Sequence, residues 1–304
     1  MSRKLQGVIP AIITPIAENG EPDLDLLRKQ TEYLASSGAH GFFVGGTTAE
    51  GAFLSTGQKK EIFKLVKEVS NGRQFLCMAA LQPSTAQVVQ EMRVLENLEP
   101  DYFVAVTPYY GEKDQPTILE HYKTLAGESS VPLILYNIPG RTQSPMSVET
   151  VLELSVVENV AGIKDSSGDF VFFTRGFLSD YPDSFKWIMG EDMLDAPALL
   201  LGGDCIVTGL SNVRVEHYIE MYNAAELGNT QKVKEYQRLI NQYREIFTVC
   251  PPVKLNAAVK AGAAFYGRAS RKMVMRSMDL NDAEYAAVTD ILSKIKSSEE
   301  HKYS

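Results

Sequence analysis

The sequence predicts an α/β protein: a (β/α)8 TIM barrel with a C-terminal helical region. Over about the first 225 of its 304 residues, eight short apolar runs alternate with amphipathic segments of helical period. Strict alternation of strand and helix implies parallel strands with right-handed crossovers, and eight such units fit a closed barrel. An open doubly wound sheet would instead carry a glycine-rich nucleotide-binding turn after its first strand, and Ile13-Thr14-Pro15 is not one.

The eight expected strands are apolar runs bounded by glycine, proline or polar turn residues. They occupy residues 7–15, 42–44, 75–80, 102–107, 132–137, 160–164, 185–189 and 205–208. Helical periodicity fills the intervals between them, and two helix ends carry clear signals. Ser55 and Gln58 have the spacing of a capping box that opens a helix, and Gly38 fits the position just after a helix C-terminus.

The pattern changes after about residue 215, beyond which no further strand is expected. Helical patterns occupy residues 233–247, 253–265 and 284–296, and Pro251-Pro252 separates the first two. We therefore expect a barrel over residues 1–225 and a helical region over residues 226–304 that packs on it. The polar residues from about 297 onward predict a disordered tail.

Composition argues against several kinds of partner and several kinds of site. The net charge of −8 argues against nucleic acid or an anionic membrane surface as the main partner. No apolar run approaches the roughly 18 residues of a membrane span. Because Pro10 and Pro15 interrupt the apolar stretch near the N-terminus, we expect no leader peptide and a cytoplasmic protein. The three cysteines and four histidines are scattered, so neither a disulfide framework nor a metal site is expected.

Lys164 stands at an unusual place, at the end of an apolar run that began at Val160. Burial disfavours the charged form of an amine, and a neutral amine is a nucleophile that forms imines with carbonyl compounds. Two structural interpretations compete with this one: the side chain could reach solvent, or it could pair with Asp165.

Other reactive side chains follow neighbouring strands. Because the active site of a TIM barrel lies at the C-terminal ends of its strands, these side chains are expected to meet in one mouth. They are Thr47, Thr48, Tyr109, Tyr110, Tyr136 and Arg141. Each could equally be a core tyrosine, a turn residue or a surface arginine. Together with a nucleophilic amine, however, they suit the condensation of an amine with a 2-oxo acid, which is class I aldolase chemistry and needs no metal.

Four stretches at these strand ends resemble the dihydrodipicolinate synthase / N-acetylneuraminate lyase family of class I pyruvate aldolases. They are Gly46-Thr47-Thr48-Ala49-Glu50, Thr107-Pro108-Tyr109-Tyr110, Tyr136-Asn137-Ile138-Pro139-Gly140-Arg141-Thr142 and Gly162-Ile163-Lys164-Asp165. The resemblance covers nearly the whole chain. It implies a TIM barrel, usually assembled as a homotetramer that is a dimer of dimers.

The resemblance also implies a covalent mechanism without a cofactor. Lys164 would form an imine with pyruvate, and Tyr136 would donate and accept a proton beside it. Thr47 and Tyr110 would complete the proton relay, with Tyr110 reaching in from a neighbouring subunit.

Substrate binding is implied for a second group of residues: Thr48, Gly46, Val207, Arg141 and Glu191. Thr48, through its backbone N–H, would hold the pyruvate carboxylate in the same glycine-rich turn as Gly46. Val207 would line the pocket through its backbone. Arg141 would clamp the carboxylate of an aldehyde, a bidentate task suited to guanidinium, and Glu191 could accept hydrogen bonds from a polyol.

Three functions remain open. Arg141 favours a 4-hydroxy-tetrahydrodipicolinate synthase-like enzyme, which joins pyruvate to aspartate semialdehyde. Glu191, and Ala49 where the synthase pattern has glycine, leave open a lyase for N-acetylneuraminate or a 2-keto-3-deoxy sugar acid. A non-catalytic 2-oxo-acid sensor is the third, although it would not need the full set of reactive residues. The positions that bind feedback lysine in many synthases carry Thr56, Lys59, Pro83 and Gln87, none a good match, so no lysine inhibition is expected.

Overall fold

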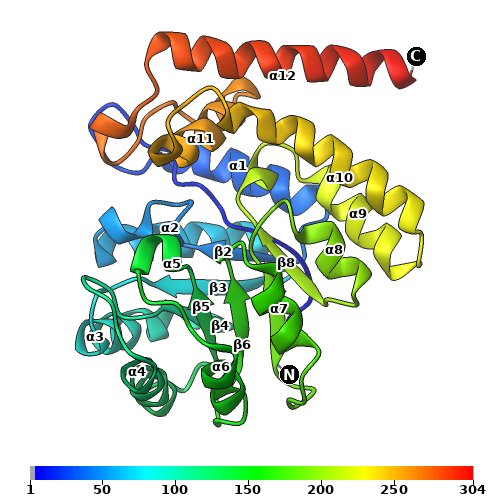
Figure 1. Ribbon diagram of the computed structural model, residues 1–304. Helices are drawn as coiled ribbons and strands as arrows, with labels where there is room; N and C mark the ends of the chain where they lie inside the picture. The colour runs from blue at the N-terminus through cyan, green and yellow to red at the C-terminus, as the bar shows by residue number, and fades with distance from the viewer. Residues whose placement is uncertain (1–3, 304) are drawn as a thin grey trace.

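The structure is a computed structural model that describes residues 4–303, with the side chains of residues 4–300. Eight parallel strands form one sheet in the order β1-β8-β7-β6-β5-β4-β3-β2 (Figure 1). They are β1 Gly7–Pro10, β2 Gly41–Val44, β3 Phe75–Ala80, β4 Tyr102–Val106, β5 Leu133–Asn137, β6 Val160–Asp165, β7 Lys186–Met189 and β8 Cys205–Thr208. Just beyond β1, Ala11 bridges Phe43 of β2, and the Ile12 N–H donates to the Phe43 carbonyl at 3.1 Å, so the sheet closes into a barrel. The predicted fold is confirmed.

Helices cover the outer face of the barrel (Figure 1). They are α1 Leu24–Ser36, α2 Thr56–Ser70, α3 Thr85–Leu95, α4 Gln115–Glu128, α6 Val148–Ser155, α7 Phe170–Phe177, α8 Asp195–Leu200 and α9 Glu216–Glu226. A further short helix, α5 Pro139–Thr142, lies in the loop after β5. Ser55 and Gln58 form the expected capping box at the start of α2, and Gly38 follows α1 with φ +97°. These local signals are therefore confirmed.

The strands are buried on both faces, which gives the molecule two apolar cores. Alternate residues of each strand face the helices or the barrel axis. The inner core contains Ile9, Phe43, Cys77, Val104, Ile134, Ile188 and Val207. The outer core contains their neighbours Val8, Phe42, Leu76, Phe103, Leu135, Ile163 and Ile206, packed against helix side chains. This alternation decides which strand residues can reach the centre of the barrel.

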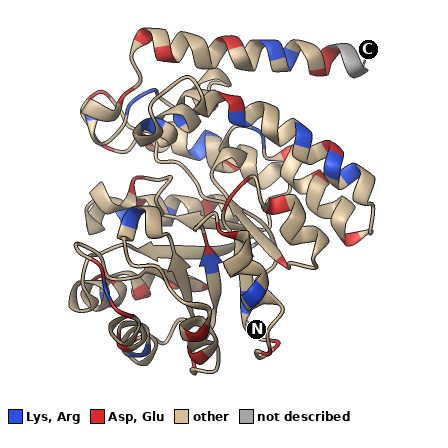
Figure 2. Ribbon diagram, viewed as in Figure 1, with Lys and Arg blue, Asp and Glu red and all other residues tan. Residues whose placement is uncertain are grey.

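Three helices follow the barrel, α10 Thr230–Arg244, α11 Leu255–Phe265 and α12 Asp282–Tyr303, and they lie together on one side of it (Figure 1). Charges of both signs are distributed along α10 and α12 (Figure 2). No helix in residues 4–303 is both long enough and apolar enough to span a membrane. Barrel helix α9 ends at Glu226, close to the expected division at residue 225, which stays a prediction.

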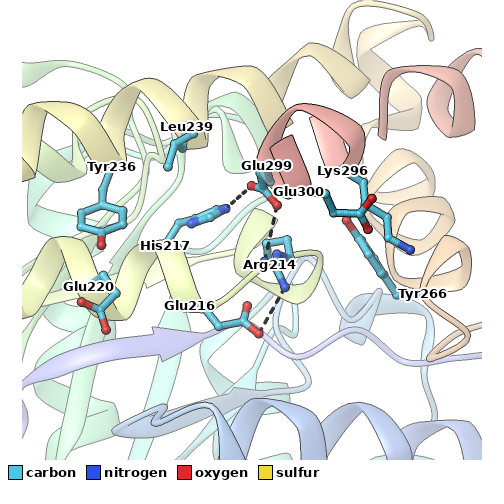
Figure 3. Close-up of a pocket in the computed structure, with 10 residues that line it drawn as sticks. All are labelled: Arg214, Glu216, His217, Glu220, Tyr236, Leu239, Tyr266, Lys296, Glu299 and Glu300. Atoms are coloured by element: carbon cyan, nitrogen blue, oxygen red, sulfur yellow. Dashed lines mark hydrogen bonds and ion pairs between the residues drawn. The ribbon is translucent and has the colours of Figure 1, made fainter. Parts of the chain in front are cut away.

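The prediction of a disordered tail from about residue 297 is wrong for the described residues, because α12 continues to Tyr303. Glu299 holds its last turns in place: its Oε1 lies 2.9 Å from His217 Nε2 and accepts from the Tyr243 hydroxyl at 3.2 Å. Arg214 also approaches Glu299, at 3.5 Å (Figure 3). Glu299, a polar residue in the expected tail, is thus a half-buried hydrogen-bond partner of side chains on α9 and α10.

Candidate active site

A cavity of about 210 Å³ lies at the C-terminal ends of the strands. Seven of the nine predicted site residues line it: Thr47, Thr48, Tyr136, Arg141, Lys164, Glu191 and Val207. The others lie elsewhere, as described below. The expectation that strand-end residues gather in one mouth therefore holds for most of the set.

Lys164 lies at the base of the cavity. Because Ile163 faces the helices, Lys164 faces the barrel axis, where it is 5% exposed. Its Nζ is 4.0 Å from the centre of the Tyr136 ring and 4.6 Å from that of Phe43. The lysine therefore does not extend into bulk solvent, but lies in an aromatic pocket.

Asp165 has its own partners on the other side of β6. Its Oδ1 accepts from Asn137 Nδ2 at 2.9 Å, and its Oδ2 accepts from the Ser167 hydroxyl at 3.1 Å. Burial raises the pKa of Asp165 to about 6 against the effect of these hydrogen bonds. The carboxyl group thus ties the ends of β5 and β6 together rather than pairing with Lys164.

Tyr136 is the nearest phenol to the amine, because the register of β5 and β6 places it directly beside Lys164. Its hydroxyl lies 3.3 Å from Thr47 Oγ1. Burial alone would raise the pKa of the phenol. The charge of Lys164 and hydrogen bonds from Lys164, Thr47 and Ser166 outweigh burial, and the pKa of Tyr136 is lowered. The phenol is therefore suited to exchange a proton with a group bound at Lys164.

Thr47 and Thr48 lie on a tight turn after β2. The N–H groups of Ala49 and Gly51 both donate to the Gly46 carbonyl, at 3.1 and 3.0 Å. A Cβ on Gly51 would lie 1.7 Å from the Gly45 carbonyl oxygen, so only glycine fits there. The turn presents the two threonine side chains to the cavity from a rigid backbone. Gly46 is buried beneath it against the Phe43 ring and does not line the cavity.

The end of β7 approaches Lys164 closely. A Cβ at Gly190 would lie 3.0 Å from Lys164 Cε and 2.3 Å from Ser166 Oγ, so a side chain there would displace Lys164. The next residues, Glu191 and Asp192, line the cavity. Asp192 accepts hydrogen bonds from the Thr208 hydroxyl and, at 2.7 Å, from the Tyr218 hydroxyl. Burial raises the pKa of Asp192 despite these bonds.

The wall opposite the strand ends comes from the C-terminal helices. Arg244, the last residue of α10, lies with Nη2 3.5 Å from Glu191 Oε1. Phe247, Leu255, Asn256 and Val259 complete this wall. Arg141, on α5, is exposed and also lines the cavity. The cavity therefore combines a buried amine and phenol at its base with two guanidinium groups at its mouth.

Comparison with known proteins agrees with this geometry. Residues 4–295 match the model of the Dihydrodipicolinate synthetase family. This protein belongs to that family. Membership makes it a carbon–carbon lyase of the class I aldolase type.

Relatives of the family are similar over most of their length. The 4-hydroxy-tetrahydrodipicolinate synthase of Methanopyrus kandleri is 31% identical over 263 residues, 86% of this chain and 87% of that protein. The enzyme of the same name from Enterococcus faecalis is 32% identical over 256 residues, 83% of this chain and 87% of that protein. The solved dihydrodipicolinate synthase of Bacteroides thetaiotaomicron has a TM-score of 0.90 at 27% identity and covers 97% of this chain and 100% of that chain.

Tyr109 and Tyr110, which the sequence analysis expected in the cavity, lie outside it. The Tyr109 hydroxyl donates to the Leu81 carbonyl at 2.9 Å. Tyr110 is 94% exposed, with a left-handed φ of +68°, and does not line the cavity. Within a single chain, therefore, Tyr136 is the phenol that faces Lys164.

The sequence analysis did not identify Arg244 or Asn256. Both occupy polar positions of helices that the periodicity predicts only to pack on the barrel, so no local pattern marks them. Asp192, next to the predicted Glu191, follows a predicted strand end, and the resemblance places Gly190-Glu191-Asp192 where sugar-acid lyases bind hydroxyl groups.

The hydrogen bond between Thr47 and Tyr136 can be tested by titration. Thr47→Val removes a group that lowers the pKa of the phenol, so the midpoint of Tyr136 ionisation should move to higher pH. Protein labelled with ¹³C at tyrosine Cζ reports this midpoint by NMR, with Tyr136→Phe to assign the resonance. Thr48→Val is the control and should leave the midpoint in place. An unmoved midpoint in Thr47→Val would contradict the assignment of the hydrogen bond.

Proposed function

We propose that this protein is a pyruvate-dependent class I aldolase in which Lys164 forms the imine, and that it acts as a 4-hydroxy-tetrahydrodipicolinate synthase on pyruvate and aspartate semialdehyde. The observation that carries the proposal is the buried Lys164 amine, 4.0 Å from the ring of Tyr136 and at the base of a strand-end cavity. Burial and an adjacent proton carrier are what an imine-forming lysine needs.

The proposed reaction proceeds through an imine and an enamine. The Lys164 amine adds to C2 of pyruvate, and Tyr136 protonates the hydroxyl group that leaves as water, which gives a protonated imine and a phenolate. The imine withdraws electrons, so the adjacent methyl group loses a proton to the phenolate and becomes an enamine. The enamine carbon then attacks the aldehyde carbon, and the aldehyde oxygen takes its proton from the Tyr136 phenol. The α-amino group of aspartate semialdehyde then adds to the imine carbon and displaces the Lys164 amine, while the Tyr136 phenolate takes up the proton that this amino group loses. The product leaves as a cyclic imine.

Three further cavity residues have roles in this scheme. Thr47 keeps the Tyr136 phenol oriented and completes the proton relay. Thr48, in the turn that also contains Gly46, holds the pyruvate carboxylate, and Val207 lines the pocket. The electron sink is the imine itself, so we propose that the reaction uses no metal or other cofactor.

The choice of aldehyde rests on Arg141. An exposed guanidinium on the rim of the cavity can form two hydrogen bonds with the carboxylate of aspartate semialdehyde. The names of the relatives support the same substrate. A sugar-acid lyase is the second candidate, because Glu191 lines the cavity. The Glu191 carboxylate is already engaged by Arg244 at 3.5 Å, which leaves less of it for a polyol.

A pair of assays tests this function. Wild-type protein should exchange the methyl protons of pyruvate with D₂O, followed by NMR, and Lys164→Ala should reduce this exchange to the uncatalysed rate. With aspartate semialdehyde added, the wild type should consume pyruvate, and Arg141→Ala should lower kcat/KM for the aldehyde by roughly 10- to 100-fold, the loss of a charge-assisted pair. Exchange without turnover of aspartate semialdehyde would reject the synthase, and cleavage of N-acetylneuraminate or a 2-keto-3-deoxy sugar acid would establish the lyase.

We also propose that the protein is cytoplasmic and a homotetramer in which Tyr110 enters the site of a neighbouring subunit. An exposed aromatic side chain on a strained turn, which does not line its own chain's cavity, supports this arrangement.

Subunit complementation tests the role of Tyr110. Tyr110→Phe and Lys164→Ala should each be nearly inactive alone. Oligomers that contain both variants should recover up to about a quarter of wild-type activity, because only mixed pairs assemble one complete site. Lys164→Ala mixed with Tyr136→Phe is the control and should recover nothing, since both residues belong to one chain's site. Absence of recovery in the first mixture would show that Tyr110 is not shared.

Lysine should not inhibit the enzyme. The Lys59 side chain is fully buried, and its ammonium group is 2.7 Å from Glu91 Oε1, so this position offers no free polar group to an incoming amino acid. Activity should stay within about twofold of its starting value at millimolar lysine, since no binding energy is available to shift the enzyme's conformation. Saturable inhibition at these concentrations would contradict the prediction.

A further inference from the structure

Two polar residues of α11 reach the turn that carries Thr47 and Thr48. Asn256 and Lys260 are four residues apart and therefore share one face of the helix. Asn256 Nδ2 donates to the Thr47 carbonyl at 2.9 Å. Lys260 Nζ donates to Glu50 Oε1 at 2.5 Å. The first and last residues of the turn are thus both held by a helix more than 200 positions further along the sequence.

The carboxylate of Glu50 is held on both oxygens. Its Oε2 accepts from the Val274 N–H at 2.9 Å, while Lys260 also donates to the Lys272 carbonyl at 2.9 Å. The side chain of Lys260 is 0% exposed and that of Glu50 is 3% exposed. Every polar group of this contact is therefore satisfied inside the protein.

Stability alone does not explain a buried ion pair, because apolar residues of similar volume usually stabilise a core at least as well. Glu50 also has a left-handed φ of +59°, a conformation that is unfavourable for a residue with a side chain. A directional contact is what fixes such a turn in one conformation. Thr47, at the other end of the turn, places its hydroxyl 3.3 Å from the Tyr136 hydroxyl.

We propose that Asn256 and Lys260 are positioning residues of the active site, which hold the turn of residues 47–50 so that the Thr47 hydroxyl stays against the Tyr136 phenol. The inference rests on the proposed function, in which these two hydroxyls relay the proton. Asn256 also lines the cavity, whereas Lys260 acts only through Glu50.

The chain provides a matched control. Lys59 on α2 and Glu91 on α3 form a second buried pair, 2.7 Å apart and with side chains 0% and 2% exposed. Neither residue lines the cavity. Lys59→Met therefore leaves a buried carboxylate without its ammonium partner, as Lys260→Met does, but away from the turn.

The experiment compares Lys260→Met, Asn256→Ala and Lys59→Met by exchange of pyruvate methyl protons with D₂O, with folding checked by near-UV circular dichroism. The maximal exchange rate should fall by roughly 10- to 100-fold in Lys260→Met and Asn256→Ala, as expected for a displaced relay group, and by less than about threefold in Lys59→Met. The half-saturating pyruvate concentration should rise as well in Lys260→Met, because Thr48 on the same turn holds the pyruvate carboxylate, and it should stay in place in Lys59→Met. Asn256→Ala leaves no unpaired buried charge, so it keeps the test valid if Lys260→Met does not fold.

A pH profile separates positioning from general destabilisation. The groups that face the Tyr136 phenol are Lys164, Thr47 and Ser166. The charged groups of the same cavity are Arg141, Glu191, Asp192 and Arg244. Displacing Thr47 removes one group that lowers the pKa of the Tyr136 phenol. The limb of the pH profile that depends on Tyr136 should therefore move to higher pH in Lys260→Met. In Lys59→Met this limb should stay in place.

Two outcomes would overturn the inference in different ways. Wild-type protein that does not exchange pyruvate protons would remove the proposed function and the inference with it. A second set of results would overturn the inference alone. In it, the wild type exchanges pyruvate protons, Lys260→Met and Asn256→Ala exchange them at the same rate as Lys59→Met, and the pH limb of Lys260→Met does not move.

Discussion

The structure depends on the placement of one amine beside one phenol. Lys164 and Tyr136 are directly paired residues on neighbouring strands β6 and β5, and both face the barrel axis. A one-residue slip of either strand would turn its side chain toward the helices. The closed barrel prevents such a slip, because each strand is held by a partner on both sides and buried on both faces. The same surroundings that stabilise the fold thus bury the Lys164 side chain.

The C-terminal helices and the barrel together form the active-site cavity. The strand ends supply the reactive groups, while α10 and α11 supply the opposite wall of the cavity through residues such as Arg244 and Asn256. At this junction the buried charge of Glu50 is paired with that of Lys260. The geometry of the turn that carries Thr47 therefore depends on a region outside the barrel.

Much of this organisation could be predicted from the sequence. Apolar runs that end in turn residues locate all eight strands, and the rule that TIM-barrel chemistry lies at strand ends identifies Lys164 and Tyr136. The contacts of α11 could not be predicted, because Asn256 and Lys260 occupy polar positions on a helix and their partners are more than 200 residues away. Glu299 was assigned to a disordered tail for the same reason: its partners lie on α9 and α10, beyond the reach of a local pattern.

The central claim is that Lys164 bonds covalently to the substrate, and reductive trapping tests it most directly. The protein is incubated with pyruvate and sodium borohydride, digested and mapped by mass spectrometry. The account predicts a stable pyruvyl adduct on the peptide that contains Lys164 and none in Lys164→Ala. Folded wild-type protein with no adduct, or with an adduct on another lysine, would contradict it.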